Sequence, residues 1–326
     1  MPGDYDIEYA SPWAGANYMP FSARDTAAAQ WDRDTWPDFK DLATNHLDAG
    51  VHFQGCRMVN RKIDMDKTYP FTGGKVDANP WWSKVFDDFR YLDPSELTEE
   101  QHSGVYFTSV CINTSIYLPW LVSQCLANGV VFKRSIFEHV SDAAAPGIHH
   151  SGHRADLVIN CTGLSSLKLG GVEDTKLYPG RGQTVLVRND AGCMYAQLGT
   201  DDGESEMMYI MTRAAGGGTV LGGCYQSNNW DSQPDPSLAN RIMKRCVSAC
   251  PKLTNGQGFE KLDVMRHAVG LRPCRNGGAR LEKEKINGIW VVHNYGHAGA
   301  GYQSSYGCSK VVLKLVEEAL QHQARL

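Results

Sequence analysis

The sequence predicts a mixed α/β fold in which an antiparallel, β-rich part is interleaved with αβ units. Two short apolar runs, Leu157–Asn160 and Ile289–Val292, indicate buried strands, and each leads into a glycine-containing turn. Between them the pattern predicts three further strands separated by glycine-rich turns: Thr184–Val187, Met207–Met211 and Thr219–Leu221. Gly216-Gly217-Gly218 is the clearest of these turns and joins the last two strands into a hairpin.

The N-terminal third predicts two helices with irregular structure between them. Residues 22–44 are polar with spaced aromatic side chains and predict a helix with loops, whereas residues 51–100 predict irregular strands and loops. From Asn113 apolar side chains recur at helical spacing, with Asn113 or Thr114 as the N-cap, until Asn128-Gly129 supplies a left-handed stop. Val130-Val131-Phe132 follows directly and predicts a short strand that completes an αβ unit.

Two later segments also predict helices. Asp235 can cap a helix over Pro236–Ala249, because proline suits the first helical position. After the Ile289–Val292 strand, the loop Gly296–Gly301 leads into a helix whose apolar positions share one face: Val311, Val312, Leu315, Val316, Ala319 and Leu320.

Composition narrows the class of protein. The chain has 326 residues, 42% hydrophobic and 21% charged, which is typical of a globular protein of about two domains. Its 32 Lys+Arg and 36 Asp+Glu give a net charge of 32 − 36 = −4 with no basic block, so nucleic acid is not expected as a partner. Because no run of about 18 apolar residues occurs, no membrane span is expected.

A metal site is not expected either. The ten cysteines are scattered without a C-x-x-C motif, which is unlike a metal or disulfide framework. His149, His150 and His153 lie in a Gly/Ser-rich segment without Cys or carboxylate partners at ligand spacing, so we interpret them as a solvated loop.

The strand, glycine-rich loop and helix over residues 289–320 form the strongest candidate binding element. Three glycines in Gly296–Gly301 let the backbone approach a ligand, and the following helix N-terminus presents unpaired N–H groups. A tight strand-to-helix turn is the alternative explanation. The end of the first strand, Asn160-Cys161-Thr162-Gly163, has the same two interpretations.

Arg272 is the candidate anion-binding residue. It follows an apolar stretch, and a guanidinium in apolar surroundings needs an anion or strong acceptors. Either an internal salt bridge or a clamp on a substrate carboxylate meets this need. Tyr209 and Tyr225 lie on the two arms of the predicted hairpin, so their hydroxyls are candidates to serve the same anion, or they are amphipathic core residues.

Several motifs, in the same order along the chain, resemble those of the D-amino-acid oxidases, in particular the fungal members. They are Ala10–Asn17, Arg181–Val187, the Tyr209 strand, Val269–Pro273 and Asn294–Gln303. The resemblance runs from about Tyr9 to the C-terminus. It implies FAD as cofactor, O2 as oxidant, and conversion of D-amino acids to 2-oxo acids, ammonia and hydrogen peroxide.

The resemblance also implies roles for single residues. Arg272 resembles the arginine that pairs with the substrate carboxylate, and Tyr209 and Tyr225 resemble tyrosines of the same pocket. Gly299 resembles the residue whose carbonyl accepts a hydrogen bond from the substrate amine. The resemblance implies the following cofactor-binding residues: Ser11, Pro12, Ala14, Gly15, Asn17, Cys161, Thr162, Gly163, Arg272, Gly296, Gly299, Ala300, Gly301, Tyr302 and Gln303.

By the same resemblance the chain divides into two interleaved parts. Residues 1–45, 105–170 and 270–326 are expected to form a Rossmann-like FAD-binding domain, and residues 46–104 and 171–269 an antiparallel substrate-binding domain. Family members begin with a βαβ unit that carries G-x-G-x-x-G, whereas this sequence opens with Met1-Pro2-Gly3. We therefore expect the FAD-binding domain to be N-terminally truncated here.

Two alternatives to this function are open. The first is a D-aspartate oxidase, which needs a further cation for the side-chain carboxylate of its substrate, and Arg213 is the candidate. The second is an inactive truncated form that does not retain FAD. The final residues Ala324-Arg325-Leu326 have the small-basic-Leu pattern of a peroxisomal import signal, so an import receptor and a peroxisomal location are expected. A homodimer is left open by the sequence.

Overall fold

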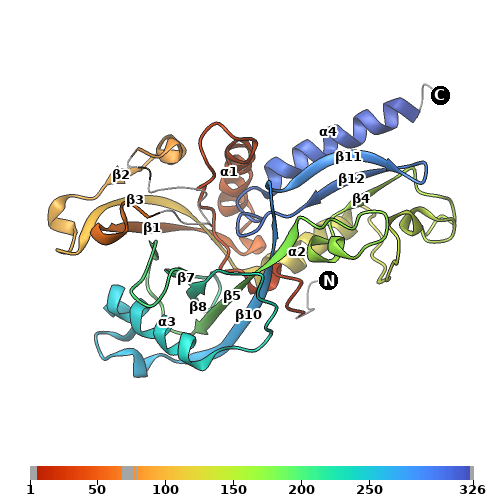
Figure 1. The fold of residues 1–326 in the computed structure, drawn as a ribbon. Helices are drawn as coiled ribbons and strands as arrows, with labels where there is room; N and C mark the ends of the chain where they lie inside the picture. Colours follow the sequence, from red (N-terminus) through yellow and green to blue (C-terminus); the bar gives the residue numbers. More distant parts are fainter. Residues whose placement is uncertain (1–5, 68–76, 78, 324–326) are drawn as a thin grey trace.

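The computed structural model describes residues 6–67, 77 and 79–323, so the expected import signal at Ala324, Arg325 and Leu326 lies outside the described residues. Two sheets organise this part of the chain (Figure 1). The larger has nine strands within the described residues, in the order β10-β5-β8-β7-β6-β1-β3-β2, with β9 paired to β5. The smaller has the order β11-β12-β4. The mixed α/β fold is therefore confirmed.

The strands of the large sheet are almost all antiparallel. Their bounds are β1 Val51–Arg61, β2 Arg90–Tyr91, β3 Gln101–Ile112, β5 Leu177–Val187, β6 Met194–Gln197, β7 Glu206–Thr212, β8 Thr219–Cys224, β9 Gln226–Ser227 and β10 Val264–Arg275. Within the described part of this sheet, β1 and β6 are the only neighbouring strands that pair in parallel. β7 and β8 form the hairpin predicted around the three glycines, with Tyr209 opposite Gly222.

The small sheet contains both apolar strands that the sequence predicted. β12 (Ile289–Tyr295) pairs in parallel with β4 (Leu157–Asn160) and antiparallel with β11 (Arg280–Ile286). This parallel pairing sets Asn160, the last residue of β4, opposite His293, two residues before the end of β12. The loops that follow them therefore meet in space.

Four α-helices accompany these sheets in the described part of the chain: α1 Ala27–Asn45, α2 Thr114–Ala127, α3 Pro236–Ala249 and α4 Ser305–Gln323. Of the two candidate caps of α2, Asn113 and not Thr114 is the N-cap, because its side chain accepts from the N–H of Ser115. The predicted cap of α3 is confirmed, because the Asp235 side chain accepts from the N–H of Ser237. One core packs α1 on β1 and β3 around Tyr18, Phe39 and Phe107, and another packs α3 on β5, β7 and β8.

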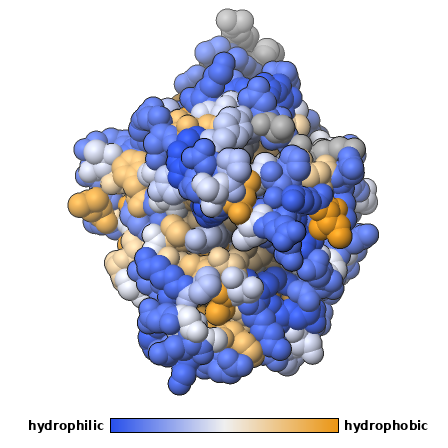
Figure 2. Space-filling view, turned by 90° about the vertical axis from the view of Figure 1, so that its left-hand side faces the viewer, coloured by the Kyte–Doolittle hydropathy of each residue, from blue (hydrophilic) through white to orange (hydrophobic). Residues whose placement is uncertain are grey.

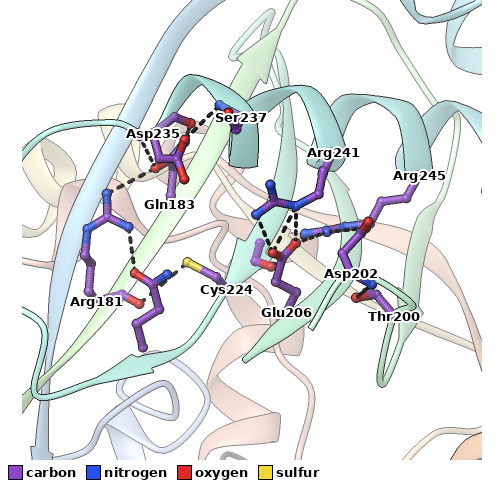
Figure 3. A network of polar contacts seen from close by, with 12 residues as sticks. Arg181, Gln183, Thr200, Asp202, Glu206, Cys224, Asp235, Ser237, Arg241 and Arg245 are labelled. Carbon is purple, nitrogen blue, oxygen red and sulfur yellow. Dashed lines mark hydrogen bonds and ion pairs between the residues drawn. The ribbon is translucent and has the colours of Figure 1, made fainter. Parts of the chain in front are cut away.

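The large sheet also positions α3 through buried polar groups (Figure 3). Arg181 of β5 is 2% exposed and donates to the Gln183 side chain at 3.1 Å. Gln183 in turn exchanges two hydrogen bonds with the backbone of Asp235, the N-cap of α3. The start of α3 is therefore fixed on β5.

Two expectations differ from the structure. Val130–Phe132 is not a strand: all three side chains are at least 37% exposed, and no strand of the described residues pairs with this segment. An apolar run becomes a strand only beside a neighbour that accepts its hydrogen bonds. In the region expected to be irregular, β1 is an unbroken strand of 11 residues; its two faces are both half-buried, so no alternation marks it.

Candidate active site

A cavity of about 1790 Å³ is lined by residues of both sheets, from β4 and β12 of the small sheet and from β5, β7 and β10 of the large one. Pockets for small ligands typically measure about 300–1,000 Å³, so this one has room for a large cofactor together with a substrate. Figure 2 shows apolar side chains across the middle of one face of the molecule, with hydrophilic ones above and below. Most of the predicted site residues line the cavity: Ser11, Ala14, Gly15, Asn17, Cys161, Thr162, Gly163, Tyr209, Tyr225, Arg272, Gly299, Gly301, Tyr302 and Gln303. Pro12, Gly296 and Ala300 do not.

Arg272 of β10 has no acidic partner in the described part of the chain. Its Nη1 donates to the carbonyls of Cys224, at 3.2 Å, and Gly180, at 3.4 Å. The internal salt bridge considered from the sequence is therefore not formed. The side chain lies across β5, where a Cβ on Gly182 would come within 2.7 Å of Nη2, so the glycine makes room for it. The guanidinium thus faces the cavity with donors to spare.

Two tyrosines lie beside this guanidinium. Tyr209 of β7 packs on Gly222 and Gly223 of β8, and the Tyr225 ring lies 5.5 Å from the Arg272 guanidinium. The Tyr225 hydroxyl is 2.9 Å from the Cys274 sulfur. Burial raises the pKa of Tyr209 and of Tyr225, although Arg272 lowers both in part. Both hydroxyls therefore stay protonated and are able to donate to an anion.

The glycine-rich loop after β12 is hydrogen-bonded to β10, the strand that carries Arg272. The Ala298 N–H donates to the Pro273 carbonyl at 2.9 Å. Gly299 comes next, and a Cβ there would lie 3.9 Å from Arg272 Cδ. The Tyr302 hydroxyl then donates to the Ser11 carbonyl at 3.0 Å. These contacts bring the candidate carboxylate anchor, the candidate amine acceptor and the N-terminal segment to one place.

Sequence reasoning missed His293, which orients the loop after β4. Asn160 is 2% exposed, and its Oδ1 accepts from the backbone and hydroxyl of Thr162. Its Nδ2 donates to His293 Nδ1 at 3.2 Å. Because an amide nitrogen only donates, Nδ1 must accept, so Nε2 carries the proton and donates to Glu284. Burial lowers the pKa of His293, which favours this neutral form.

Asp32 of α1 was also missed, and it holds Gln303 of the glycine-rich loop. Gln303 Nε2 donates to Asp32 Oδ2 at 3.2 Å, and the Tyr18 hydroxyl donates to the Asp32 carbonyl at 2.8 Å. Asp32 is 0% exposed, and this burial raises its pKa to about 6. The signal in the sequence was weak, because one acidic residue in a helical pattern usually faces water.

Replacing Asp32 with asparagine is expected to stabilise the protein above pH 7. The folded-state pKa is raised to about 6 from 3.8, so the native state binds a proton more tightly than the unfolded chain, and the free energy of unfolding falls as pH rises through this window. Asparagine does not ionise, so Asp32→Asn should gain up to about 3 kcal/mol at pH 8 and almost nothing below pH 4. Urea unfolding at both pH values measures this, with Asp41→Asn, at an exposed position of the same helix, as control. A loss of stability at pH 8 would contradict the prediction.

The cavity wall contains polar atoms that lack hydrogen-bond partners and could bind a cofactor. Asn17 Nδ2, Asn294 Oδ1, His297 Nε2 and Ser305 Oγ are buried and find no hydrogen-bond partner within the described residues, and all four residues line the cavity. Burial lowers the pKa of His297 to about 4, so it is neutral. A buried polar atom is costly to leave unpaired. Donors and acceptors on an otherwise apolar wall fit a large ring system with polar edges, as in a flavin dinucleotide.

Other site classes gain no support from the described residues. These hold no group of three or more His, Cys, Asp or Glu side chains that is arranged to bind a metal ion. Nor does the described part of the chain contain a helix of sufficient length and apolarity to cross a membrane.

Comparison with known proteins places this geometry in a family. A D-amino-acid oxidase of Fusarium vanettenii is 50% identical over 98% of this chain and 88% of its own length. A D-aspartate oxidase of Talaromyces thermophilus is 32% identical over 95% of this chain and 79% of its own length. A solved glycine oxidase from Bacillus cereus shares the fold, with a TM-score of 0.69 at 18% identity over 95% of this chain and 87% of that one. The profile described as FAD dependent oxidoreductase matches residues 3–315. The chain belongs to the family of FAD-dependent oxidoreductases.

Proposed function

We propose that this protein is a D-amino-acid oxidase that uses FAD and O2 to convert D-amino acids to 2-oxo acids, ammonia and hydrogen peroxide. The relative that is 50% identical and named D-amino-acid oxidase supports the reaction class. One observation carries the substrate class. Arg272 faces the cavity without a carboxylate partner among the described residues, and two protonated tyrosines lie beside it. A guanidinium with adjacent hydroxyl donors suits the carboxylate of an amino acid.

The residues of this chain would hold two substituents of the substrate Cα. Arg272 would pair with the carboxylate, with donation from Tyr209 and Tyr225. The Gly299 carbonyl, which follows the Ala298–Pro273 hydrogen bond, would accept from the amine. With these two groups fixed, only one enantiomer would direct its Cα hydrogen toward the cofactor. Orientation of the substrate therefore performs most of the catalysis. When bound, FAD supplies the hydride acceptor and the route by which O2 becomes hydrogen peroxide.

The cofactor would lie along the remaining lining residues. We propose that Ser11, Ala14, Gly15 and Asn17 contact it from the N-terminal segment, together with Cys161–Gly163 and Gly301–Gln303. Residues 1–45, 105–170 and 270–326 would then form the cofactor domain, and 46–104 and 171–269 the substrate domain. The site residues with the least support are Pro12, Gly296 and Ala300, because they do not line the cavity.

D-Aspartate is a weaker candidate substrate. The cation considered for its side chain, Arg213, does not line the cavity; its side chain is 5% exposed and donates to the Ala14 carbonyl at 2.6 Å. Purified protein should show flavin absorbance, and kcat/KM for D-alanine should exceed that for D-aspartate at least about tenfold. Flavin-free protein that resists reconstitution would contradict the oxidase function, and a preference for D-aspartate would contradict the substrate class.

A peroxisomal location is also proposed. The tripeptide Ala324-Arg325-Leu326 fits an import signal read by a receptor, and a peroxide-forming oxidase suits a compartment that removes peroxide. A fluorescent fusion to the N-terminus should be punctate, and deletion of the tripeptide should make it diffuse. Unchanged distribution after deletion would refute the signal.

A further inference from the structure

A buried ion-pair cluster joins α3 to the start of β7, outside the cavity (Figure 3). Glu206 is 4% exposed and accepts hydrogen bonds from Arg241, at 2.6 Å, and from Arg245. A buried carboxylate is tolerated when it is paired and hydrogen-bonded, and the two guanidinium groups of α3 provide this. The proposed reaction assigns no task to this cluster.

The two arginines differ in two contacts, the first of which is a hydrogen bond from Arg245 Nη1 to Asp202 Oδ2 at 3.3 Å. Arg245 also donates through Nη2 to the Gly223 carbonyl of β8 at 2.8 Å, and its side chain is 12% exposed. Arg241 has a side chain 37% exposed, and its hydrogen bonds within the described residues go to Glu206 alone. Both therefore neutralise Glu206, but only Arg245 reaches the strand that underlies the site.

Gly223 lies among the residues assigned to the substrate carboxylate. The Tyr209 ring rests on Gly222 and Gly223, so that a Cβ on Gly223 would come within 2.6 Å of the Tyr209 hydroxyl oxygen. The next carbonyl, that of Cys224, accepts from Arg272, and Tyr225 follows it. A shift of Gly223 would therefore move the support of Tyr209, the anchor of Arg272 and the backbone of Tyr225 together.

We propose that Arg245, oriented by Glu206, is a positioning residue for the carboxylate-binding subsite. By holding the Gly223 carbonyl, it keeps the backbone over residues 222–225 where Tyr209, Tyr225 and Arg272 converge. It acts through β8, since Arg245 is not among the residues that line the cavity. The inference rests on the proposed function, in which these three side chains bind the substrate carboxylate.

The matched pair Arg245→Gln and Arg241→Gln tests this in the flavin-loaded enzyme. Each variant removes one arginine from Glu206, but only Arg245→Gln loses the contacts with Gly223 and Asp202. Asp202→Asn removes the charge of the second contact alone and should leave KM and Kd within about twofold. Loss of a hydrogen bond from a charged donor corresponds to about a tenfold change in an equilibrium constant. We expect Arg245→Gln to raise KM for D-alanine and Kd for benzoate, a simple carboxylate, about tenfold, with kcat within about twofold. Arg241→Gln should leave KM and Kd within about twofold, and Arg245→Lys should recover part of the loss.

Equal increases in KM and Kd for the two variants would overturn the inference, as would a fall in kcat with KM unchanged. If Arg245→Gln does not fold, the double variant Glu206→Gln/Arg245→Gln replaces it, because no buried carboxylate is then left underpaired. Failure of the wild type to oxidise any D-amino acid would overturn the proposed function instead. The benzoate comparison would still decide whether Arg245 supports the Arg272 subsite.

Discussion

Replacing Arg272 with alanine is expected to lower kcat/KM for D-alanine by at least about 150-fold, which corresponds to about 3 kcal/mol. The guanidinium makes only two long hydrogen bonds to backbone carbonyls within the described residues, so its remaining donors are free for a carboxylate. Without it, the two tyrosine hydroxyls would face the anion without a counter-charge. Arg272→Lys should fall between the wild type and alanine, because lysine keeps the charge but loses the planar pair of donors.

Steady-state kinetics with D-alanine measures this effect. Arg188→Ala is the control, because Arg188 pairs with Asp263 at 3.1 Å in an ion pair whose side chains are 65% and 57% exposed. That variant should stay within about twofold of the wild type. An unchanged KM in Arg272→Ala would remove Arg272 from the carboxylate assignment.

Replacing Gly307 with alanine should destabilise the fold by at least about 3 kcal/mol, because overpacking against a backbone has no inexpensive relief. Gly307 lies in the first turn of α4, where a Cβ would come within 2.6 Å of Trp31 Cα and 2.7 Å of Trp31 C in α1. Its N–H donates to the buried Thr35 hydroxyl at 2.9 Å, so the two helices touch backbone to backbone. The gain in helix propensity, about 1 kcal/mol, is too small to offset the clash.

The midpoint of urea unfolding measures this change. Ser309→Ala is the control, because it places alanine at an exposed position of α4 that is two residues later and away from Trp31. It should change the free energy of unfolding by less than about 0.5 kcal/mol. Gly307→Ala with wild-type stability would mean that α1 and α4 separate at almost no cost.

The strands and helices with a single clear periodicity were predictable. The apolar runs of β4 and β12 indicate strands, and the capping residues of α3 indicate a helix; the structure confirms all three. β11 was missed because its sequence, Arg280–Ile286, consists mostly of charged residues. These charges are satisfied by neighbours that a local pattern does not show, such as Lys283 with Glu318 of α4 at 2.5 Å.

In the candidate site, too, residues in local motifs were predictable, whereas residues that depend on distant partners were not. Arg272 and Tyr209 were predicted from short motifs, and the structure places both in the cavity wall. Asp32 and His293 were missed because their partners, Gln303 and Asn160, lie 271 and 133 residues away in the sequence. Val130–Phe132 failed for the complementary reason: its own pattern is that of a strand, but the described residues supply no neighbour.

The bond between the Tyr302 hydroxyl and the Ser11 carbonyl joins residues 291 apart. The cavity it helps to close takes walls from the beginning, the middle and the end of the chain. During synthesis, which proceeds at about 5–20 residues per second, the N-terminal wall must therefore wait many seconds for its counterpart. The nascent chain stays without a complete pocket until residues 296–303 have left the ribosome. The order of the chain therefore prevents an incompletely synthesised protein from carrying out a peroxide-forming reaction.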